Sequence, residues 1–350
     1  MKKLEQNSHK KRIKCVVWDL DNTLWDGILL EDSEVYLKAC SKKIIEELDY
    51  RGILQSVISK NDYVTAVKKM KEFGIDEYFL YPQINWEAKS KGIKNIADSI
   101  NISLDSIMFI DDQFFERDEV NFSFPEVMCV DSSRIADLLD FPELNPEFIT
   151  DDSKIRRQLY INDIKRAEIE ESFEGSKEGF LASLDMVLTI RPVEKDDLKR
   201  VEELTVRTHQ LNSTGYTYSY EELEKFRELK EYKLYIAELN DKYGTYGKIG
   251  VVVLYCEKDT WTIKLLLMSC RVVSRGIGTI MINFIKNMAR KKGVNLKADF
   301  VKTDLNRMMY LTYRFTGFNE LSSKDNFEEL LADLNVIQSY PDYMKVVIYG

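Results

Sequence analysis

A short apolar run that ends in two acids constrains the fold of this chain more than any other feature. The sequence predicts a strand over residues 15–20, with Asp19, Asp21 and then Thr23 at its end. Such a run is typical of a buried parallel strand in an α/β sheet. Side chains two residues apart on a strand point the same way, so both acids can converge on one metal ion or phosphoryl group. The alternative is that the acids simply cap the next helix.

The first part of the chain alternates strand and helix patterns. The predicted strands cover residues 15–20, 53–58 and 107–110, and the predicted helices cover residues 35–48, 62–73 and about 87–99. Repeated β-α units of this length predict an α/β fold with a doubly wound parallel sheet.

The pattern changes in the second half of the chain. Long strands of hairpin character are followed by a β-α-β-α ending, which predicts a separate α+β domain. The expected parts are a flexible basic tail (1–12), the α/β domain (13–148), a helical connector (149–185) and the α+β domain (186–350).

Composition excludes several classes of protein. The apolar fraction of 44% and the charged fraction of 31% are ordinary for a soluble globular protein. A net charge of −9 without a basic face argues against a nucleic-acid partner. No apolar run approaches the roughly 20 residues of a membrane span. Five cysteines without a CxxC pair fit a reducing compartment, so we expect a cytoplasmic protein.

Polar residues follow three of the predicted strands. Asp19 and Asp21 follow the first, Ser59 follows the second, and Asp111 and Asp112 follow the third. Carboxylates are hard oxygen ligands that suit Mg²⁺, and the cation offsets their mutual repulsion. A serine hydroxyl and a lysine ammonium can hold phosphoryl oxygens, and one carboxylate can attack phosphorus.

Two lysines compete for the phosphate-binding role. Lys89 and Lys91 both lie near the start of the helix predicted between the second and third of these strands. Lys89 is preferred because its position at the helix start lets it face the edge of the sheet.

Together these motifs resemble the haloacid-dehalogenase (HAD) phosphatase superfamily over about residues 13–135. The resemblance implies that Asp19 is the phosphoryl-accepting nucleophile and Asp21 the general acid/base. It implies metal binding by Asp19, Asp21, Asp111 and Asp112, with Asp112 either a second ligand or an acid in the outer shell of the metal. The candidate phosphate-binding residues are Thr23, Ser59, Lys60, Asn61 and Lys89. No large cap domain fits between Thr23 and Ser59, so loops or the second domain must select the substrate.

A glycine turn marks the second domain. Gly276 and Gly278 precede a predicted helix in a segment that resembles the acyl-CoA loop of GNAT-type N-acetyltransferases, although a tight turn is an equal alternative. Cys270 and Arg271 precede this loop, where a nearby cation and helix start favour a thiolate. His209 lies in a polar run and is a further candidate catalytic residue, together with Cys270. A buried structural cysteine and a structural histidine are the alternatives.

The order of the two domains extends the resemblance to nearly the whole chain. The segments that carry it are residues 18–27, 59–62, 109–112 and 269–272. They resemble the FkbH-like family (HAD subfamily IIIC), whose members load a glyceryl unit from 1,3-bisphosphoglycerate onto an acyl carrier protein for polyketide-type pathways. The resemblance implies a phosphorylated acyl donor, a separate carrier protein as partner, and Cys270 as the acyl-accepting thiol.

Two other functions remain open. One is a HAD phosphatase fused to an acetyl-CoA-dependent acyltransferase that acts on a sugar or another small metabolite. The other is a non-enzymatic docking module with a vestigial site.

Overall fold

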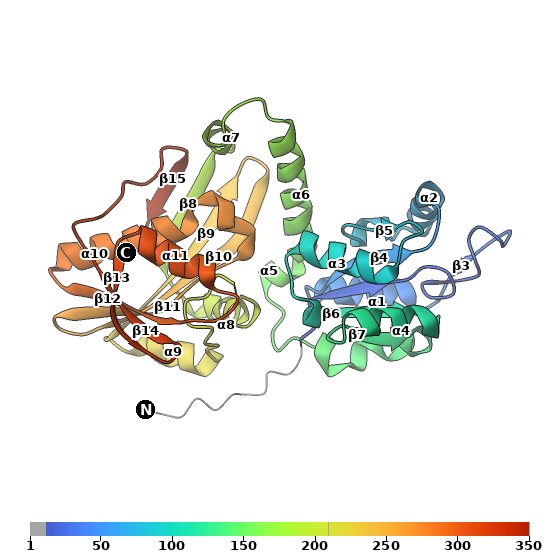
Figure 1. Ribbon diagram of the computed structural model, residues 1–350, viewed down its shortest axis with the longest axis horizontal. Helices are drawn as coiled ribbons and strands as arrows, with labels where there is room; N and C mark the ends of the chain where they lie inside the picture. The colour runs from blue at the N-terminus through green and yellow to red at the C-terminus, as the bar shows by residue number, and fades with distance from the viewer. Residues whose placement is uncertain (1–11, 209, 350) are drawn as a thin grey trace. The chain divides into compact units, whose positions relative to one another are not determined.

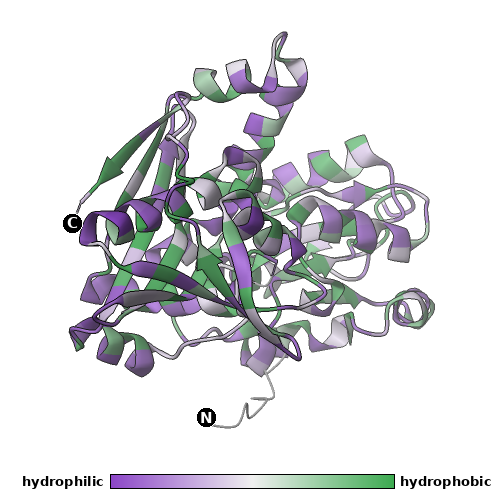
Figure 2. Ribbon diagram, turned by 60° about the vertical axis from the view of Figure 1, so that its left-hand side comes forward, coloured by the Kyte–Doolittle hydropathy of each residue, from purple (hydrophilic) through white to green (hydrophobic). Residues whose placement is uncertain are grey.

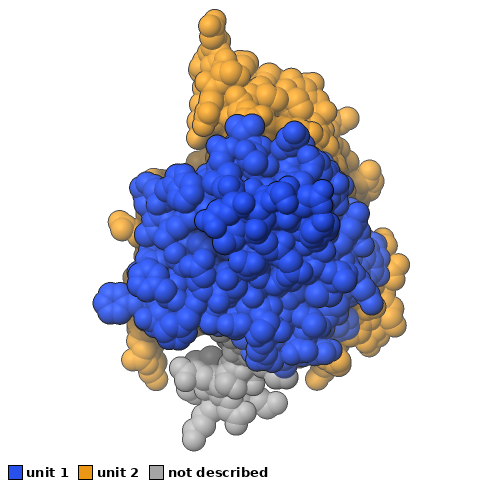
Figure 3. Space-filling view, turned by 90° about the vertical axis from the view of Figure 1, so that its right-hand side faces the viewer, with its two compact units in different colours: residues 1–161 blue, residues 162–350 orange. Residues whose placement is uncertain are grey.

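The chain folds into two compact units. The computed structural model describes residues 12–208 and 210–349, and it divides into Met1–Ile161 and Asn162–Gly350 (Figures 1 and 3). The division falls inside helix α6 (Arg156–Ser172). The helices of the predicted connector are therefore divided between the two units.

Unit 1 is built on a five-stranded sheet in which every pairing is parallel. The strand order is β5-β4-β1-β6-β7. Its strands are β1 (Cys15–Trp18), β4 (Leu54–Ser59), β5 (Gln83–Ile84), β6 (Ile107–Asp111) and β7 (Met128–Asp131). The predicted parallel α/β sheet is confirmed.

The central strand β1 lies where the winding of the sheet reverses. After β1 the chain adds β4 and β5 on one side, then returns to add β6 and β7 on the other. All residues of β1, β4 and β6 are buried, as expected for strands covered on both faces. Ligands of open α/β sheets bind beyond the carboxyl ends of the strands at such a reversal. Here the reversal lies between β1 and β6.

The three predicted helices of unit 1 are present, but the first begins later than predicted, and the helix over residues 114–123 was not predicted. The helices of unit 1 are α1 (Ser41–Tyr50), α2 (Tyr63–Phe73), α3 (Lys89–Ile100), α4 (Phe114–Ser123) and α5 (Asp151–Lys154). The helix predicted from residue 35 begins only at Ser41. The residues before it form β3 (Tyr36–Leu37), which pairs with β2 (Trp25–Asp26). The prediction was wrong there because the pairing of Leu37 with Trp25 overrides the helical spacing of apolar residues.

Unit 2 contains a mixed eight-stranded sheet of order β13-β14-β12-β11-β10-β9-β8-β15. Its strands are β8 (Met186–Pro192), β9 (Tyr232–Asp241), β10 (Gly244–Cys256), β11 (Thr260–Met268), β12 (Asn295–Val301), β13 (Phe318–Lys324), β14 (Phe327–Ala332) and β15 (Met344–Ile348). The pairs β11·β12 and β8·β15 are parallel and the others antiparallel. The predicted α+β character is confirmed, and the hairpin β13-β14 was not predicted.

Helices cover both faces of this sheet. The helices are α7 (Lys177–Ser183), α8 (Leu198–Arg207), α9 (Tyr220–Glu228), α10 (Ile277–Lys292) and α11 (Arg307–Phe315). Alternate strand residues enter two separate cores, one with α10 and α11 and one with α8 and α9. In Figure 2 hydrophobic stretches run along strands of this kind, as expected when both faces of a sheet are covered.

Short 3-10 helices complete the described structure. They are η1 (Asp76–Tyr78), η2 (Leu104–Ser106), η3 (Ser132–Asp140), η4 (Pro142–Leu144), η5 (Lys195–Asp197) and η6 (Cys270–Arg275). Among the described residues, every helix is too short or too polar to span a lipid bilayer.

Candidate functional site

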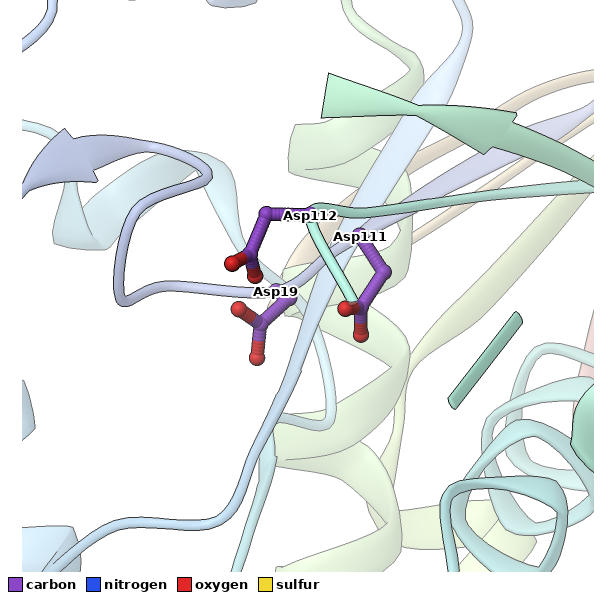
Figure 4. A group of neighbouring side chains, drawn as sticks. All are labelled: Asp19, Asp111 and Asp112. Atoms are coloured by element: carbon purple, nitrogen blue, oxygen red, sulfur yellow. The ribbon is translucent and has the colours of Figure 1, made fainter. Parts of the chain in front are cut away.

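Three carboxylates converge at the carboxyl edge of the unit 1 sheet. Asp19 follows β1, Asp111 ends β6, and Asp112 comes next in the chain. Each offers an oxygen to a group whose atoms lie within 4.8 Å of one another (Figure 4). The group lies at the reversal between β1 and β6, because the adjacent ends of these parallel strands bring residues distant in sequence together.

A buried lysine bridges two of these carboxylates. Lys89 begins α3, and its Nζ atom lies 2.7 Å from Oδ1 of Asp19 and in hydrogen-bonding contact with Oδ2 of Asp111. Lys89 is 4% exposed, Asp19 5% and Asp111 0%. The rival lysine, Lys91, forms an exposed ion pair with Glu87 instead. The structure thus brings Lys89 into the candidate site and leaves Lys91 on the surface.

Burial sets the protonation behaviour of this group. It raises the pKa of Asp19 to about 7, since the ammonium of Lys89 only partly offsets the loss of water and Asp111 adds repulsion. The pKa of Asp111 is also raised by burial, against the opposing effect of Lys89. Burial lowers the pKa of Lys89, but the two carboxylates outweigh this and hold it above its usual range. The lysine therefore remains charged.

The donor set fits a magnesium ion. Three carboxylates face one ammonium in a site that is largely withdrawn from water, which leaves the group short of positive charge. Mg²⁺ is usually bound through one or two carboxylates and keeps waters that can bridge to phosphate. Asp19, Asp111 and Asp112 would hold the ion, and its charge would lower the raised carboxylate pKa values.

Asp21 lies outside this carboxylate group, and its predicted role as a metal ligand stays a prediction. Its Oδ1 accepts hydrogen bonds from Trp25 Nε1 at 2.8 Å and Leu29 N at 3.1 Å, and its Oδ2 accepts one from Asn61 Nδ2 at 3.0 Å. Burial is the largest cause of the raised pKa of Asp21. A carboxyl that is held in place and protonates readily suits an acid/base role.

Two predicted phosphate ligands contact other side chains. The Thr23 hydroxyl accepts a hydrogen bond from the Asp112 backbone at 3.0 Å and lies 3.5 Å from the Asp112 carboxylate, so it holds Asp112 in place. Its role in binding phosphate stays a prediction. Lys60 pairs with Glu116 at 2.6 Å. Ser59 ends β4 at the same sheet edge and is buried. Its role in binding phosphate remains a prediction.

Sequence reasoning missed two supports of the site. Arg117 donates a hydrogen bond to the Asp111 carbonyl at 2.7 Å and also pairs with Asp131 at the end of β7. Trp25 orients Asp21 through its indole N–H. Trp25 lies only four residues after Asp21. Residue spacing nevertheless predicts neither the Trp25 contact nor the Arg117 contact, because both form only when the loops fold back.

In unit 2 a small apolar pocket lies at the start of α10. It has a volume of about 80 Å³ and is lined by Leu211, Met268, Val272, Val273, Gly276, Gly278, Thr279, Met308 and Thr312. Gly276 has φ = +75°, and a Cβ there would lie 2.8 Å from the Tyr343 hydroxyl. A Cβ on Gly278 would lie 2.8 Å from Met268 Cε. Both predicted glycines therefore line the pocket, and both are needed for close approach.

Two of the reactive residues predicted in unit 2, Cys270 and Arg271, are not among the residues that line the pocket. Cys270 begins η6 immediately beyond β11 and is partly buried. Arg271 donates to the Tyr246 carbonyl at 2.7 Å and pairs with Asp163 at 3.6 Å, so its charge is already engaged. His209 lies outside the described residues.

Comparisons with known proteins give limited likenesses. No known family profile matches the chain, and no curated protein matches it. One similar solved structure is the N-terminal part of the protein BF1531 from Bacteroides fragilis, which contains a phosphatase domain complexed with Mg. The identity is 28%, the TM-score is 0.34, and the match covers 39% of this chain and 40% of that one. The chain therefore spans only about two fifths of that structure's length.

Two acetyltransferases are also similar to part of this chain. The ribosomal-protein-S18-alanine N-acetyltransferase from Escherichia coli is 16% identical, with a TM-score of 0.33 and coverage of 41% of this chain and 90% of that chain. The PaiA N-acetyltransferase from Thermoplasma acidophilum, in complex with coenzyme A, is 16% identical with a TM-score of 0.34, and the match covers 42% and 98%. The site assignments rest on the geometry above.

Proposed function

We propose that unit 1 is an Mg²⁺-dependent phosphotransferase or phosphatase of the HAD type. The observation that carries this proposal is the buried contact of Lys89 with both Asp19 and Asp111, next to the Asp112 carboxylate. Positioning and charge stabilisation dominate phosphoryl transfer, and this arrangement supplies both. It places one carboxylate beside an ammonium that can bind the phosphoryl oxygens.

The residues divide the reaction between them. An Asp19 oxygen attacks phosphorus and forms the new P–O bond, while the bond from phosphorus to the leaving oxygen breaks. Asp21 gives its proton to that leaving oxygen, then takes a proton from the water that attacks the aspartyl phosphate. The second attack releases inorganic phosphate and restores Asp19. Bound Mg²⁺ supplies positive charge for the phosphoryl oxygens.

For the whole chain we propose acyl transfer from a phosphorylated acyl donor of the 1,3-bisphosphoglycerate type to the thiol of a separate acyl carrier protein. In this proposal Cys270 displaces phosphate from the acyl carbon and holds the acyl group as a thioester. Unit 1 removes the remaining phosphate. The whole-chain resemblance and the position of Cys270 at the start of η6, just after β11, support this assignment.

A second candidate is an acetyl-CoA-dependent acyltransferase in unit 2. The apolar pocket at the start of α10 favours it, because Gly276 and Gly278 both lie in its wall. Binding of acetyl-CoA without any dependence on a carrier protein would select this alternative.

Hydrolysis of p-nitrophenyl phosphate tests the proposal for unit 1. We expect hydrolysis that requires Mg²⁺ and that is lost in Asp19→Asn but retained in Asp26→Asn, since Asp26 is exposed on β2. Hydrolysis that persists in EDTA would exclude the assignment. For the whole chain, mass spectrometry after incubation with 1,3-bisphosphoglycerate should show a glyceryl adduct that is absent from Cys270→Ala.

A further inference from the structure

Strands β11 and β12 separate next to the apolar pocket. Their parallel ladder runs only from the pair Thr260–Asn295 to the pair Ile263–Ala298. Beyond Ile263, β11 continues to Met268, which lines the pocket. Two strands that diverge in this way leave backbone N–H and C=O groups that need other partners.

A segment of the chain itself fills this gap. Leu211 accepts a hydrogen bond from Met268 N at 2.9 Å through its carbonyl. Ser213 N donates to the Leu266 carbonyl at 2.9 Å, and Ser213 Oγ accepts from Leu266 N at 3.0 Å. On the opposite strand, Val301 N donates to the Ser213 carbonyl at 2.9 Å. The segment 211–213 therefore acts as a short strand between β11 and β12.

This inserted segment is held from within the protein. The Asn212 side chain is fully buried, and its Oδ1 accepts hydrogen bonds from Thr214 N at 3.1 Å and Gly215 N at 2.9 Å. Asn306 Nδ2 donates to the Asn212 carbonyl at 3.1 Å. Asn212 also bridges Leu267 of β11 in antiparallel register. These contacts with Thr214, Gly215, Asn306 and Leu267 hold the segment in place.

The position of the segment limits what the pocket can bind. Amide groups of an extended ligand pair with an open strand edge in the way that an added peptide strand does, and the pantetheine arm of coenzyme A carries such amides. In β11 that edge is already paired with segment 211–213 where it meets the pocket. At the start of α10, the Tyr343 hydroxyl lies next to Gly276, 2.8 Å from the position that a Cβ would take.

We propose that Asn212 and Ser213 are specificity-determining residues of unit 2 that exclude acyl-coenzyme A. They hold the chain's own segment in the place of the amide-bearing arm. The acyl group that unit 2 transfers then has to come from a compact donor that binds without strand pairing. An acyl phosphate is such a donor. This inference rests on the proposed acyl-transfer role of unit 2 and is independent of the chemistry in unit 1.

Calorimetric titration of the full chain with acetyl-CoA tests the proposal. We expect no binding by the wild-type protein up to about 1 mM, and at least about tenfold tighter binding by the double variant Asn212→Ala/Ser213→Ala. Ser219→Ala is the matched control, since it removes a helix cap of α9 on the same connection and leaves β11 untouched. Wild-type binding tighter than about 100 μM, or a folded double variant that binds no better, would overturn the proposal.

Amide hydrogen exchange of the wild-type protein gives a second measurement if the double variant does not fold. The amides of Leu266 and Met268 should exchange slowly without ligand. Their exchange rates should not change in about 1 mM acetyl-CoA, the highest concentration of the titration. Fast exchange, or added protection with acetyl-CoA, would contradict the inserted segment. Neither measurement depends on phosphatase activity, so failure here is distinct from failure of the proposed function.

Discussion

Each unit contains a buried cluster of charges, and the two clusters differ in balance. In unit 1, one ammonium faces three carboxylates at the end of the parallel sheet. The pKa of Asp19 is raised to about 7 because burial outweighs the effect of Lys89. Such a cluster is not satisfied by the protein alone.

The cluster in unit 2 is balanced. Arg166 on α6 is 1% exposed and donates to both carboxylate oxygens of Asp241 at 2.8 Å. It also pairs with Asp163 at 2.9 Å, and its guanidinium lies 3.7 Å from the centre of the Tyr246 ring. Arg271 pairs with the same Asp163. Two guanidinium groups thus meet two carboxylates.

The difference in charge balance distinguishes a candidate ligand-binding site in unit 1 from a structural ion cluster in unit 2. Burial raises the pKa of Asp163 in unit 2 as well, so the two clusters differ in their count of charges. Equal numbers of opposite charges need no added ion, whereas the excess of carboxylates at the strand ends of unit 1 calls for a cation. The following experiments test that distinction in order of expected effect.

The largest effect is expected for Asp19→Asn. The amide cannot attack phosphorus, so hydrolysis of p-nitrophenyl phosphate should fall at least about a thousandfold. The Mg²⁺-dependent rate is the measurement, with Asp26→Asn as the control. A rate within tenfold of wild type, or about 1.4 kcal/mol, would remove Asp19 from the chemistry.

Arg166→Met should destabilise unit 2 by about 3–5 kcal/mol, because it leaves the buried carboxylate of Asp241 without its partner. Urea-dependent hydrogen exchange in the strands of unit 2 measures this loss. Lys195→Met is the control, since Lys195 forms an exposed ion pair with Glu224. If Arg166→Met instead abolished phosphate hydrolysis under conditions where both units stay folded, the distinction between site and support would fail.

Lys89→Met should lower the rate of hydrolysis by about a hundredfold or more, since it removes the charge that stabilises both the carboxylates and the phosphoryl oxygens. It should also raise the pKa of Asp19 further. The steady-state rate over a range of pH measures both effects. Lys91→Met should behave as wild type, and equal losses in the two variants would contradict the assignment of Lys89.

The smallest effect is expected from the metal alone. Mg²⁺ at ten times its dissociation constant should stabilise unit 1 by about 1.4 kcal/mol and leave unit 2 unchanged. Hydrogen exchange with and without the ion resolves the two units. Asp111→Asn should abolish the gain. Equal stabilisation of both units would show that the ion acts non-specifically.

The sequence predicted the parallel sheet and the residues that meet at its edge because those signals are local. Asp19, Ser59 and Asp111 each follow an apolar strand, and parallel strands bring their ends together. The orientation of Asp21 could not be predicted, since it depends on Trp25 and Asn61 after the loops have folded. The inserted segment was equally hidden, because residues 211–213 carry no strand pattern and pair only where β11 and β12 diverge.

The pairing of β8 with β15 has a consequence for the order in which the protein is made. The first strand of unit 2 forms one of its two ladders with residues synthesised roughly 150 positions later. At typical rates of translation that wait lasts about 8–30 s, during which β8 is an open template for other chains. Unit 1 needs no such delay, because its five strands all lie before residue 132. The nascent protein should therefore complete the sheet of unit 1 while β8 still has an open edge.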